Sequence, residues 1–568
     1  MRKTALWIML WGSLLAGTLY ADRHKFSQDL ADRLGQGDQD VDVIVQYRQD
    51  PSDADLAKLP ARRARVKEHW KRIRAVSVTA PASALDALSD DANVVYVTPD
   101  REVRAQFDYS EQTINAPYAW QLGLDGTGVS IAVVDSGIND VDDLERANSQ
   151  KSRVVYREVF HGAPGDQYGH GTHVAGIIAG NGSDSTGKKY TMTFKGVAPN
   201  ANLIDLEVLD RNGVATDSAV IKAIDRAIDL QNRYNIRVLN LSLGRPIAES
   251  STIDPLDQAV AAAWKAGIVV VVAAGNLGRN GYSSILSPGN SPYAITVGAM
   301  KTMGTPARSD DLIASYSSKG PTWLDMTLKP DLVAPGNEVI SLLAQNSTLA
   351  QMYPQNIVPL SSYSTMKFGQ SNYFTLSGTS MATPMVSGAA ALMIQQDPTL
   401  TPDTVKARLM LTATKNFPAS SVAIDPVTGT AYTSEYDAFT VGAGYLDIMG
   451  ALAATAVATA GTLSPTVFVD PTSGNAYIVD DSTQVWVSSQ AFRTIAIWGT
   501  TEVWSTGSAV QGTVAIWGTR GGAKTQSVTG TIAIWGSRQA WSASSVWGTT
   551  AIWGTANDWG TLLECLGE

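Results

Sequence analysis

GTSMATPMVSGAAALMIQQ, residues 378–396, is the stretch around which the chain is organised. Small residues around Ser380 allow a sharp backbone turn, and the alanine-rich run behind it has the propensity and the small side chains of a tightly buried helix. Ser380 is therefore expected at a helix start, where unpaired N–H groups and the helix dipole suit a developing oxyanion. Serine is also a common helix N-cap without any chemistry. A catalytic interpretation needs a base, an orienting carboxylate and a second oxyanion donor elsewhere in the chain.

Length and composition place the chain among large globular proteins. Its 568 residues suggest about three or four domains. A hydrophobic fraction of 44% is ordinary for a folded protein, and a formal net charge of -10 argues against a general nucleic-acid partner. The sole cysteine, Cys565, excludes an intrachain disulfide, so stability must come from the core or from bound ions.

The N-terminal residues 1–21 have the layout of a signal peptide. They read MRKTALWIMLWGSLLAGTLYA, with a basic start, an apolar run and small residues before Asp22. The alternative is a membrane anchor, but the apolar run is shorter than the ~20 residues that span a bilayer. We expect cleavage near Ala21 and a secreted protein, extracellular or at the cell surface.

Residues 22–105 are predicted to form a small α+β unit. Alternating apolar patterns predict strands at 41–47, 75–78 and 94–97. The segment 61–74, ARRARVKEHWKRIR, is interpreted as a helix that carries seven Lys or Arg residues against one Glu. A basic helix could contact nucleic acid or an acidic membrane, but a solvated face of this small unit is the favoured interpretation.

From residue 129 onward, apolar runs alternate with helical patterns. Runs that are apolar on both faces and separated by helices predict a parallel sheet with helices on both faces, where ligands bind beyond the carboxyl ends of the strands. The predicted strands are 129–134, 203–209, 237–243, 268–274 and 294–299, and the helical patterns are 217–231 and 255–266.

Four polar features follow these runs. Asp135 ends the first run, residues 242–244 (SLG) end the third, and Asn276 ends the fourth. Between the first two runs, a glycine-rich turn leads into a small-residue helix with His170 at its mouth. The carboxyl ends of parallel strands meet at one edge of a sheet, so these features are expected to converge there with Ser380.

These motifs, taken together, resemble those of the subtilase family of serine endopeptidases. The resemblance rests on DSG at Asp135, HGTHVAG at His170, AAGN at Asn276 and GTSMATP at Ser380, in that order. It implies a subtilisin-like catalytic domain over 106–456, in which a predominantly parallel sheet carries helices on both faces. It also implies that residues 22–105 are a prodomain that inhibits the enzyme and assists its folding.

The resemblance assigns a role to each residue. Ser380 is the nucleophile, His170 the general base and later acid, Asp135 the orienting carboxylate, and Asn276 a donor to the oxyanion. The residues that flank the pocket for the substrate residue before the cut bond are Ser242, Leu243, Gly244, Ala274 and Gly275. The substrates would be polypeptides, and the precursor would cut itself between about Arg101 and Ser110.

Leu277 follows the expected oxyanion donor and puts an apolar side chain near that pocket. A preference for apolar or uncharged residues before the cut bond is therefore a hypothesis.

No metal ligand is assigned. His173 lies three residues after His170, but without an HExxH pattern or a third ligand it is interpreted as structural. The acidic residues Asp140, Asp142 and Asp143 lack the spacing of a calcium loop and are interpreted as a solvated turn. The resemblance implies that the chemistry needs no cofactor; a structural calcium ion remains possible, with no site assigned.

Residues 457–568 contain tryptophan repeats. AIWG recurs with tryptophans at 498, 517, 535 and 553, at spacings of 19, 18 and 18 residues. A periodic strand motif followed by Gly-Thr or Gly-Ser turns predicts a β-rich region of stacked short strands. Rows of exposed aromatic residues could also hold a cell surface or a polymer, but structural stacking is the favoured interpretation, because tryptophan is costly to leave in water. The rival function is therefore a catalytically silent surface-binding or adhesive protein.

Overall fold

The computed structural model divides the chain into two compact units, Met1–Ala105 and Gln106–Glu568. It describes residues 25–27, 30, 39–61, 63–71, 74–99, 109–146, 149–425, 428–458 and 461–469, together with six short tail strands between 476 and 553. The predicted signal peptide and most of the predicted maturation segment lie outside the described residues. Among the helices that are described, none combines the length and the apolarity needed to cross a membrane.

The first unit is a four-stranded antiparallel sheet in the order β2-β3-β1-β4. Its core contains the buried residues Val43, Val45, Val76 and Val78 of the sheet. Leu85 of the helix α4 belongs to the same core. The elements are β1 (Asp40–Tyr47), α2 (Asp53–Leu56), α3 (Lys58–Ala61), β2 (Arg65–Trp70), β3 (Ala75–Pro81), α4 (Ala82–Ser89) and β4 (Val94–Pro99).

The helix predicted over 61–74 is wrong. Residues Arg65–Trp70 form the edge strand β2, which pairs with β3. Lys, Arg and Glu favour helices when isolated, but here pairing with a buried strand outweighs that propensity. Four of the six strand residues are exposed, and charged side chains on an exposed edge also discourage pairing with other chains.

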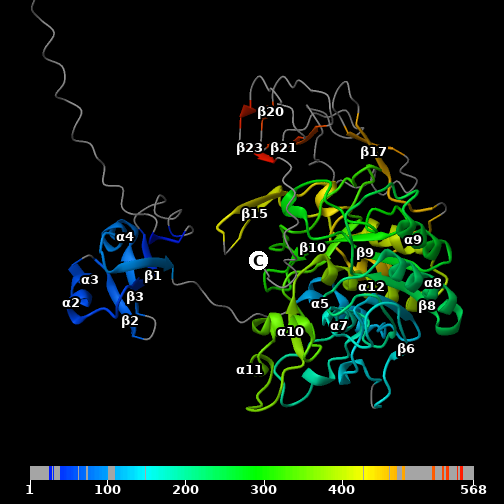
Figure 1. Cartoon of the computed structure of the whole chain (residues 1–568), viewed down its shortest axis with the longest axis horizontal. Helices are drawn as coiled ribbons and strands as arrows, with labels where there is room; N and C mark the ends of the chain where they lie inside the picture. Colours follow the sequence, from blue (N-terminus) through cyan, green and yellow to red (C-terminus); the bar gives the residue numbers. More distant parts are fainter. Residues whose placement is uncertain are drawn as a thin grey trace, which may run out of the picture. The chain divides into compact units, whose positions relative to one another are not determined.

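The second unit is built on an eight-stranded sheet in the order β11-β10-β9-β8-β5-β7-β6, with β12 paired to β10 (Figure 1). All pairings except that of β10 with β11 are parallel. This confirms the predicted fold class. The strands are β5 (Ser130–Asp135), β6 (Val154–Val159), β7 (Asn202–Glu207), β8 (Ile236–Leu241), β9 (Val269–Ala273), β10 (Ile295–Lys301), β11 (Leu312–Ile313) and β12 (Leu332–Pro335).

Helices cover the sheet in two packed pairs. The helices α7 (His170–Ala179) and α12 (Thr379–Gln396) pack against each other, as do α8 (Asp217–Tyr234) and α9 (Pro255–Lys265). Nearly the whole of α12 is buried against the sheet. Its small residues also permit close packing against the connection before β7, since a Cβ atom at Gly388 would come within 2.6 Å of Val197 Cβ. The helix α13 (Pro402–Thr412) follows.

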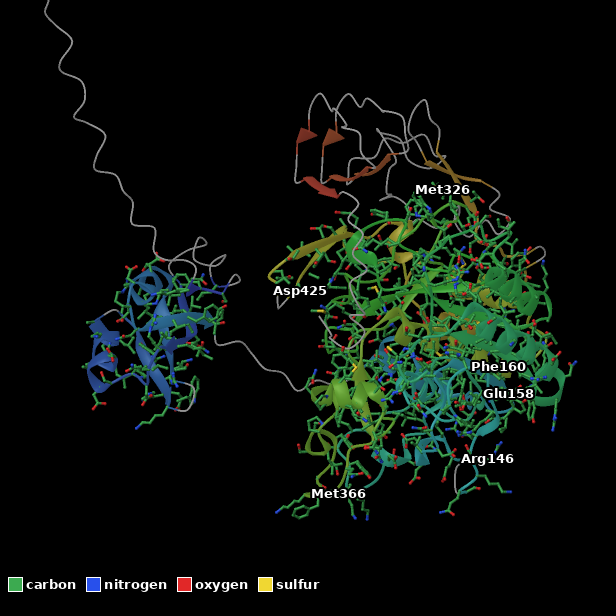
Figure 2. All side chains as sticks on the ribbon, in the orientation of Figure 1. Arg146, Glu158, Phe160, Met326, Met366 and Asp425 are labelled. Carbon is green, nitrogen blue, oxygen red and sulfur yellow. The ribbon has the colours of Figure 1, made fainter. Side chains whose placement is uncertain are left out.

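A long connection interrupts a β-hairpin close to α12. The strands β13 (Val339–Leu342) and β14 (Tyr373–Leu376) pair in antiparallel fashion, and residues 343–372 between them contain α10 (Thr348–Met352) and α11 (Leu360–Tyr363). Met366 of this connection lies at the outer edge of the unit (Figure 2). This excursion was not predicted from the sequence.

The segment that follows the predicted end of the catalytic domain is bonded to the second unit through buried charges. Ser464 Oγ donates to Asp331 Oδ1 at 2.6 Å, and Lys406 Nζ donates to Ser464 Oγ at 2.7 Å. Asp331 also pairs with Lys329 at 2.7 Å, and both lysines are fully buried. The boundary at residue 456 stays a prediction.

Three copies of the AIWG motif are short strands. The strands β19 (Val514–Gly518), β21 (Ile532–Gly536) and β23 (Thr550–Trp553) pair in parallel, which sets Trp517, Trp535 and Trp553 opposite one another in register. Trp498 lies outside the described residues. The β-rich repeat region as a whole stays a prediction.

Candidate active site

His170 and Asp135 meet at the carboxyl edge of the sheet. Asp135 is the last residue of β5, and His170 is the first residue of α7. His170 Nδ1 lies 2.7 Å from Asp135 Oδ1, and both side chains are buried. A carboxylate accepts hydrogen bonds, so the ring donates through Nδ1–H, which leaves Nε2 as the nitrogen that can accept a proton. The pair therefore has the geometry of a base held by an orienting carboxylate.

Gly171, the residue after His170, allows the start of α7 to lie close to the turn that follows β5. A Cβ atom at Gly171 would lie 2.3 Å from Gly137 O and 3.2 Å from Asp135 Cβ. A side chain there would collide with the turn that follows β5. The glycine of the HGTH motif is thus required by the close approach of two backbone segments.

Asp166 joins the turn after Asp135 to the start of α7. Its Oδ1 accepts from Ser136 Oγ at 2.7 Å and from Gly169 N at 2.6 Å, and its Oδ2 accepts from Thr172 N at 2.8 Å. Ser136 Oγ in turn accepts from Gly171 N at 2.9 Å. Burial raises the pKa of Asp166 despite these donors. The network fixes both segments that present the His170–Asp135 pair.

Asp166 and Ser136 were not predicted from the sequence as site residues. Each lies next to a recognised motif: Ser136 directly follows Asp135, and Asp166 comes four residues before His170. Their positions beside glycine-rich turns were the available signal, but sequence spacing alone does not show that they bond to each other.

Ser380 lies in the first turn of α12, beside the end of β8. Its Oγ donates to Ser242 O at 3.2 Å, and Ser242 Oγ donates to Ser380 O at 2.8 Å. Gly378 is the N-cap residue of α12, so the predicted helix start is correct. Because α12 packs against α7, the helix that carries Ser380 in its first turn and the helix that begins at His170 are neighbours.

Asn276 is positioned by the residue before Ser380. Its Oδ1 accepts from Thr379 N at 2.9 Å and from Thr379 Oγ1 at 3.0 Å, which turns Nδ2 away from Thr379. A Cβ atom added to Gly378 would lie 3.3 Å from Asn276 Nδ2 and 3.6 Å from Ser380 N. Two N–H donors therefore border one small space beside Ser380, which is the arrangement that an oxyanion requires.

The residues expected at the substrate pocket follow two adjacent strands. Residues 242–244 come after β8, and Ala274 and Gly275 come after β9, its parallel neighbour. The two segments lie beside Ser380 and Asn276, respectively. Leu277 donates its N–H to Ser318 Oγ at 3.0 Å and is half-buried, and its influence on the substrate stays a prediction.

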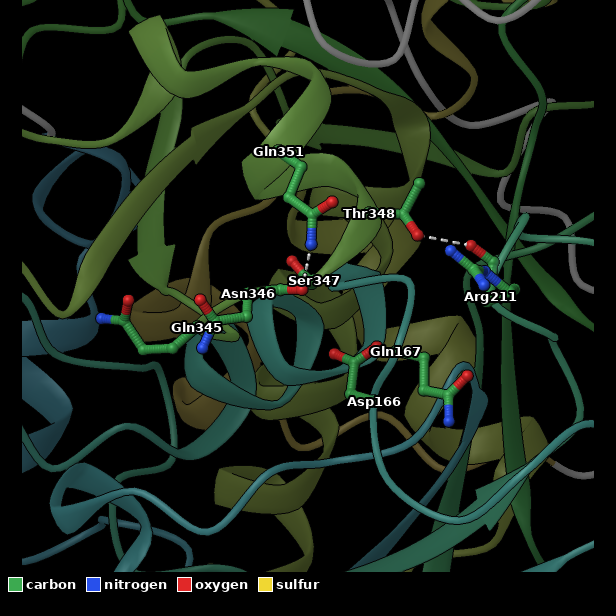
Figure 3. Close-up of a pocket in the computed structure, with 8 residues that line it drawn as sticks. All are labelled: Asp166, Gln167, Arg211, Gln345, Asn346, Ser347, Thr348 and Gln351. Carbon is green, nitrogen blue, oxygen red and sulfur yellow. Dashed lines mark hydrogen bonds between the residues drawn. The ribbon is translucent and has the colours of Figure 1, made fainter.

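A polar pocket of about 270 Å³ adjoins the segment before His170 (Figure 3). Thr348 of the 343–372 excursion binds this segment, since its N–H donates to Gln167 O at 2.9 Å. Its Oγ1 also donates to Arg211 O, in the connection after β7, at 2.7 Å. The residues that line the pocket are Asp166, Gln167, Arg211, Gln345, Asn346, Ser347, Thr348 and Gln351. The pocket therefore lies beside the segment that contains Asp166.

His173 has a structural environment. It is buried on α7, and its Nε2 lies 3.0 Å from Phe374 O and 3.2 Å from Val339 O. Burial lowers the pKa of His173 to about 3, so the ring is neutral near pH 7 and donates to these carbonyl groups. It thereby ties α7 to the β13–β14 hairpin.

The interpretation of Asp143 as part of a solvated turn is wrong. Asp143 is fully buried and accepts from Asp184 N at 2.6 Å, Ser183 Oγ at 3.0 Å and Tyr373 OH at 2.7 Å. Protein donors thus bond to both carboxylate oxygens of Asp143. The exposed Asp140 pairs with Arg157 at 2.6 Å. Within the described ranges, no three His, Cys, Asp or Glu side chains are grouped to hold a metal ion.

Comparison with known proteins adds an independent observation. The sequence profile of the subtilase family matches residues 126–444. The chain belongs to the subtilase family. It is 39% identical over 354 residues to serine protease AprX of Bacillus subtilis, with 61% of this chain and 75% of AprX covered. It is 32% identical over 422 residues to subtilisin E of Bacillus subtilis, with 73% of this chain and 95% of subtilisin E covered. This subtilase is a subtilisin-like serine endopeptidase.

Proposed function

We propose that Ser380, His170 and Asp135 form the catalytic triad and that Asn276 completes the oxyanion hole. The observation that carries this proposal is the buried 2.7 Å contact of His170 Nδ1 with Asp135 Oδ1 at the start of α7, next to α12, which carries Ser380 in its first turn. A serine hydroxyl is a poor nucleophile until an adjacent imidazole takes its proton. The imidazole of His170, which Asp135 holds in place, is that base.

The reaction then proceeds through an acyl-enzyme. His170 Nε2 takes the proton of Ser380 Oγ as the oxygen attacks the substrate carbonyl, and Asp135 stabilises the imidazolium that forms. The carbonyl oxygen becomes an oxyanion between Asn276 Nδ2 and Ser380 N–H. His170 passes its proton to the leaving amine, and a water molecule hydrolyses the ester by the same steps.

The protein is further proposed to be exported as a self-processing precursor. The layout of residues 1–21 supports export. The compact fold of the first unit, which ends near Ala105, supports a separate prodomain that binds the mature enzyme as an inhibitor. The tryptophan repeats would attach the enzyme to a cell surface or a polymer. A precursor carrying Ser380→Ala should keep its full length in pure solution; conversion to the shorter form would argue against self-cleavage.

Covalent labelling tests the triad against the rival surface-binding function. A fluorophosphonate should label the wild-type protein and should fail to label the Ser380→Ala variant. Ser362→Ala is the matched control, because Ser362 is exposed and bonds only locally to Pro359 O at 2.6 Å. A wild-type protein that is folded, takes no label and hydrolyses no peptide would favour the adhesive alternative.

A further inference from the structure

Leu286 lies between the two segments of the proposed substrate pocket. Its N–H donates to Ala274 O at 3.0 Å, which ties it to the segment after β9. The next residue, Ser287, exchanges two backbone hydrogen bonds of 2.8 Å with Arg245, directly after Gly244. The Leu286 backbone is therefore anchored to both sides of the pocket.

The side chain of Leu286 contacts both glycines of this pocket. A Cβ atom at Gly275 would lie 2.7 Å from Leu286 Cγ and 2.9 Å from Leu286 Cδ1. A Cβ atom at Gly244 would lie 3.1 Å from Leu286 Cβ and 3.5 Å from Leu286 Cδ1. Leu286 Cδ1 thus lies against both walls, and a Cβ atom on Gly275 would displace the leucine.

Leu286 differs from the leucines and isoleucines of the core. Its neighbour Ile285 is fully buried, whereas Leu286 remains half-buried. Gly275 directly precedes Asn276, and Gly244 belongs to the segment whose Ser242 O accepts from Ser380 Oγ. A partly exposed leucine at this junction is consistent with a side chain that borders the opening for the substrate.

We propose that Leu286 closes the inner end of the pocket for the substrate side chain before the cut bond. The enzyme therefore selects small side chains there, such as alanine, over leucine and phenylalanine. This inference rests on the proposed function and narrows the apolar preference to a size limit. An alanine methyl group fits in front of Leu286, whereas a benzyl group requires Leu286 to move.

The test uses the mature enzyme and peptides that differ only in the residue before the cut bond. Wild type, Leu286→Ala and the control Leu312→Ala are compared, since Leu312 is a half-buried leucine on β11. Fluorophosphonate labelling counts the active sites in each preparation. We expect wild type to prefer alanine to phenylalanine by about 10-fold or more in kcat/KM, because single methylene groups in apolar pockets change selectivity by about 10- to 200-fold. Leu286→Ala should shift this ratio toward phenylalanine by about 10-fold or more, and Leu312→Ala by less than about twofold.

Two results would overturn the inference. One is a wild-type enzyme that cleaves after phenylalanine as fast as after alanine, and the other is an unchanged ratio in Leu286→Ala. Both results require labelled, active enzyme, so they differ from failure of the proposed function, in which labelling and hydrolysis are absent. If Leu286→Ala does not fold, the alanine-to-phenylalanine ratio is measured in Leu286→Val instead. The residues before the wild-type cleavage sites in a mixture of unfolded proteins provide a second test of the size limit. Cuts mainly after large residues would refute the size limit.

Discussion

Replacement of Asp166 by alanine tests whether the buried network behind His170 positions the catalytic pair. The substitution removes the acceptor of Ser136 Oγ, Gly169 N and Thr172 N, at 2.7, 2.6 and 2.8 Å. It leaves the direct contact between His170 and Asp135 chemically intact. Any loss of activity must then come from a change in position.

The structure sets the magnitude of the effect. A buried donor without a partner costs about 1–3 kcal/mol, and the hydroxyl of Ser136 can rotate to another acceptor while the two backbone N–H groups cannot. The loss of an acceptor for these two N–H groups alone would lower the free energy of unfolding by about 2–6 kcal/mol. Since Asp166 borders the polar pocket, water can replace part of the lost bonding. We therefore expect the free energy of unfolding to fall by about 2–3 kcal/mol, near the lower limit.

Stability and activity are measured in separate proteins. Denaturant unfolding is followed in the Ser380→Ala background, so that no protein is lost to proteolysis, and kcat is measured in the active enzyme. A misplacement of the base by about 1 Å costs about 100-fold in rate, so kcat should fall by that order while KM changes little. Asp142→Ala, which changes an exposed acid in the connection between β5 and β6, is the control and should shift stability by less than about 0.5 kcal/mol. An Asp166→Ala enzyme with wild-type kcat would refute the positioning role.

Three further predictions concern single contacts. Asn276→Ala should lower kcat by about 100- to 1,000-fold with little change in KM, and an unchanged kcat in a peptide assay would exclude its role at the oxyanion. Tyr373→Phe removes the hydroxyl that lies 2.7 Å from Asp143 Oδ2 and 2.8 Å from Ser185 Oγ, and should cost about 1–3 kcal/mol in denaturant unfolding; no loss would show that water replaces it. Burial and the charge of Asp143 raise the pKa of Asp184 from 3.8 to about 6, so its contribution to stability is full below about pH 4 and is lost as the pH rises to about 6. Asp184→Asn should flatten this decline in Tm, and an unaltered pH profile would contradict the assignment.

The parallel sheet could be predicted because its strands are apolar on both faces. Residues 129–134 and 268–274 contain hardly any polar side chain, and only a strand covered by helices on both sides buries such a run. The polar residue that ends each run then marks the site. Asp135 and Asn276 were found in this way, and the structure sets them beside His170 and the Thr379–Ser380 turn, respectively.

Features that depend on tertiary contacts could not be predicted. β2 has the charged composition of a helix, and only its pairing with β3 makes it a strand. In the sequence, Asp143 is one of three acids close together. Its buried environment includes Tyr373, which lies 230 residues further along the chain. Leu286 shows no periodicity that distinguishes it from a core leucine. Its effect on the pocket follows from its contacts with two glycines on separate segments.

The crystal structure of the mature enzyme inactivated by a fluorophosphonate tests the triad most directly. We predict a phosphorus atom bonded to Ser380 Oγ, with one phosphoryl oxygen about 3 Å from both Asn276 Nδ2 and Ser380 N. His170 Nε2 should lie within hydrogen-bond reach of the adduct, with Nδ1 still bonded to Asp135. An adduct on another residue, or a Ser380 adduct whose oxygen points away from Asn276 and His170, would contradict the account.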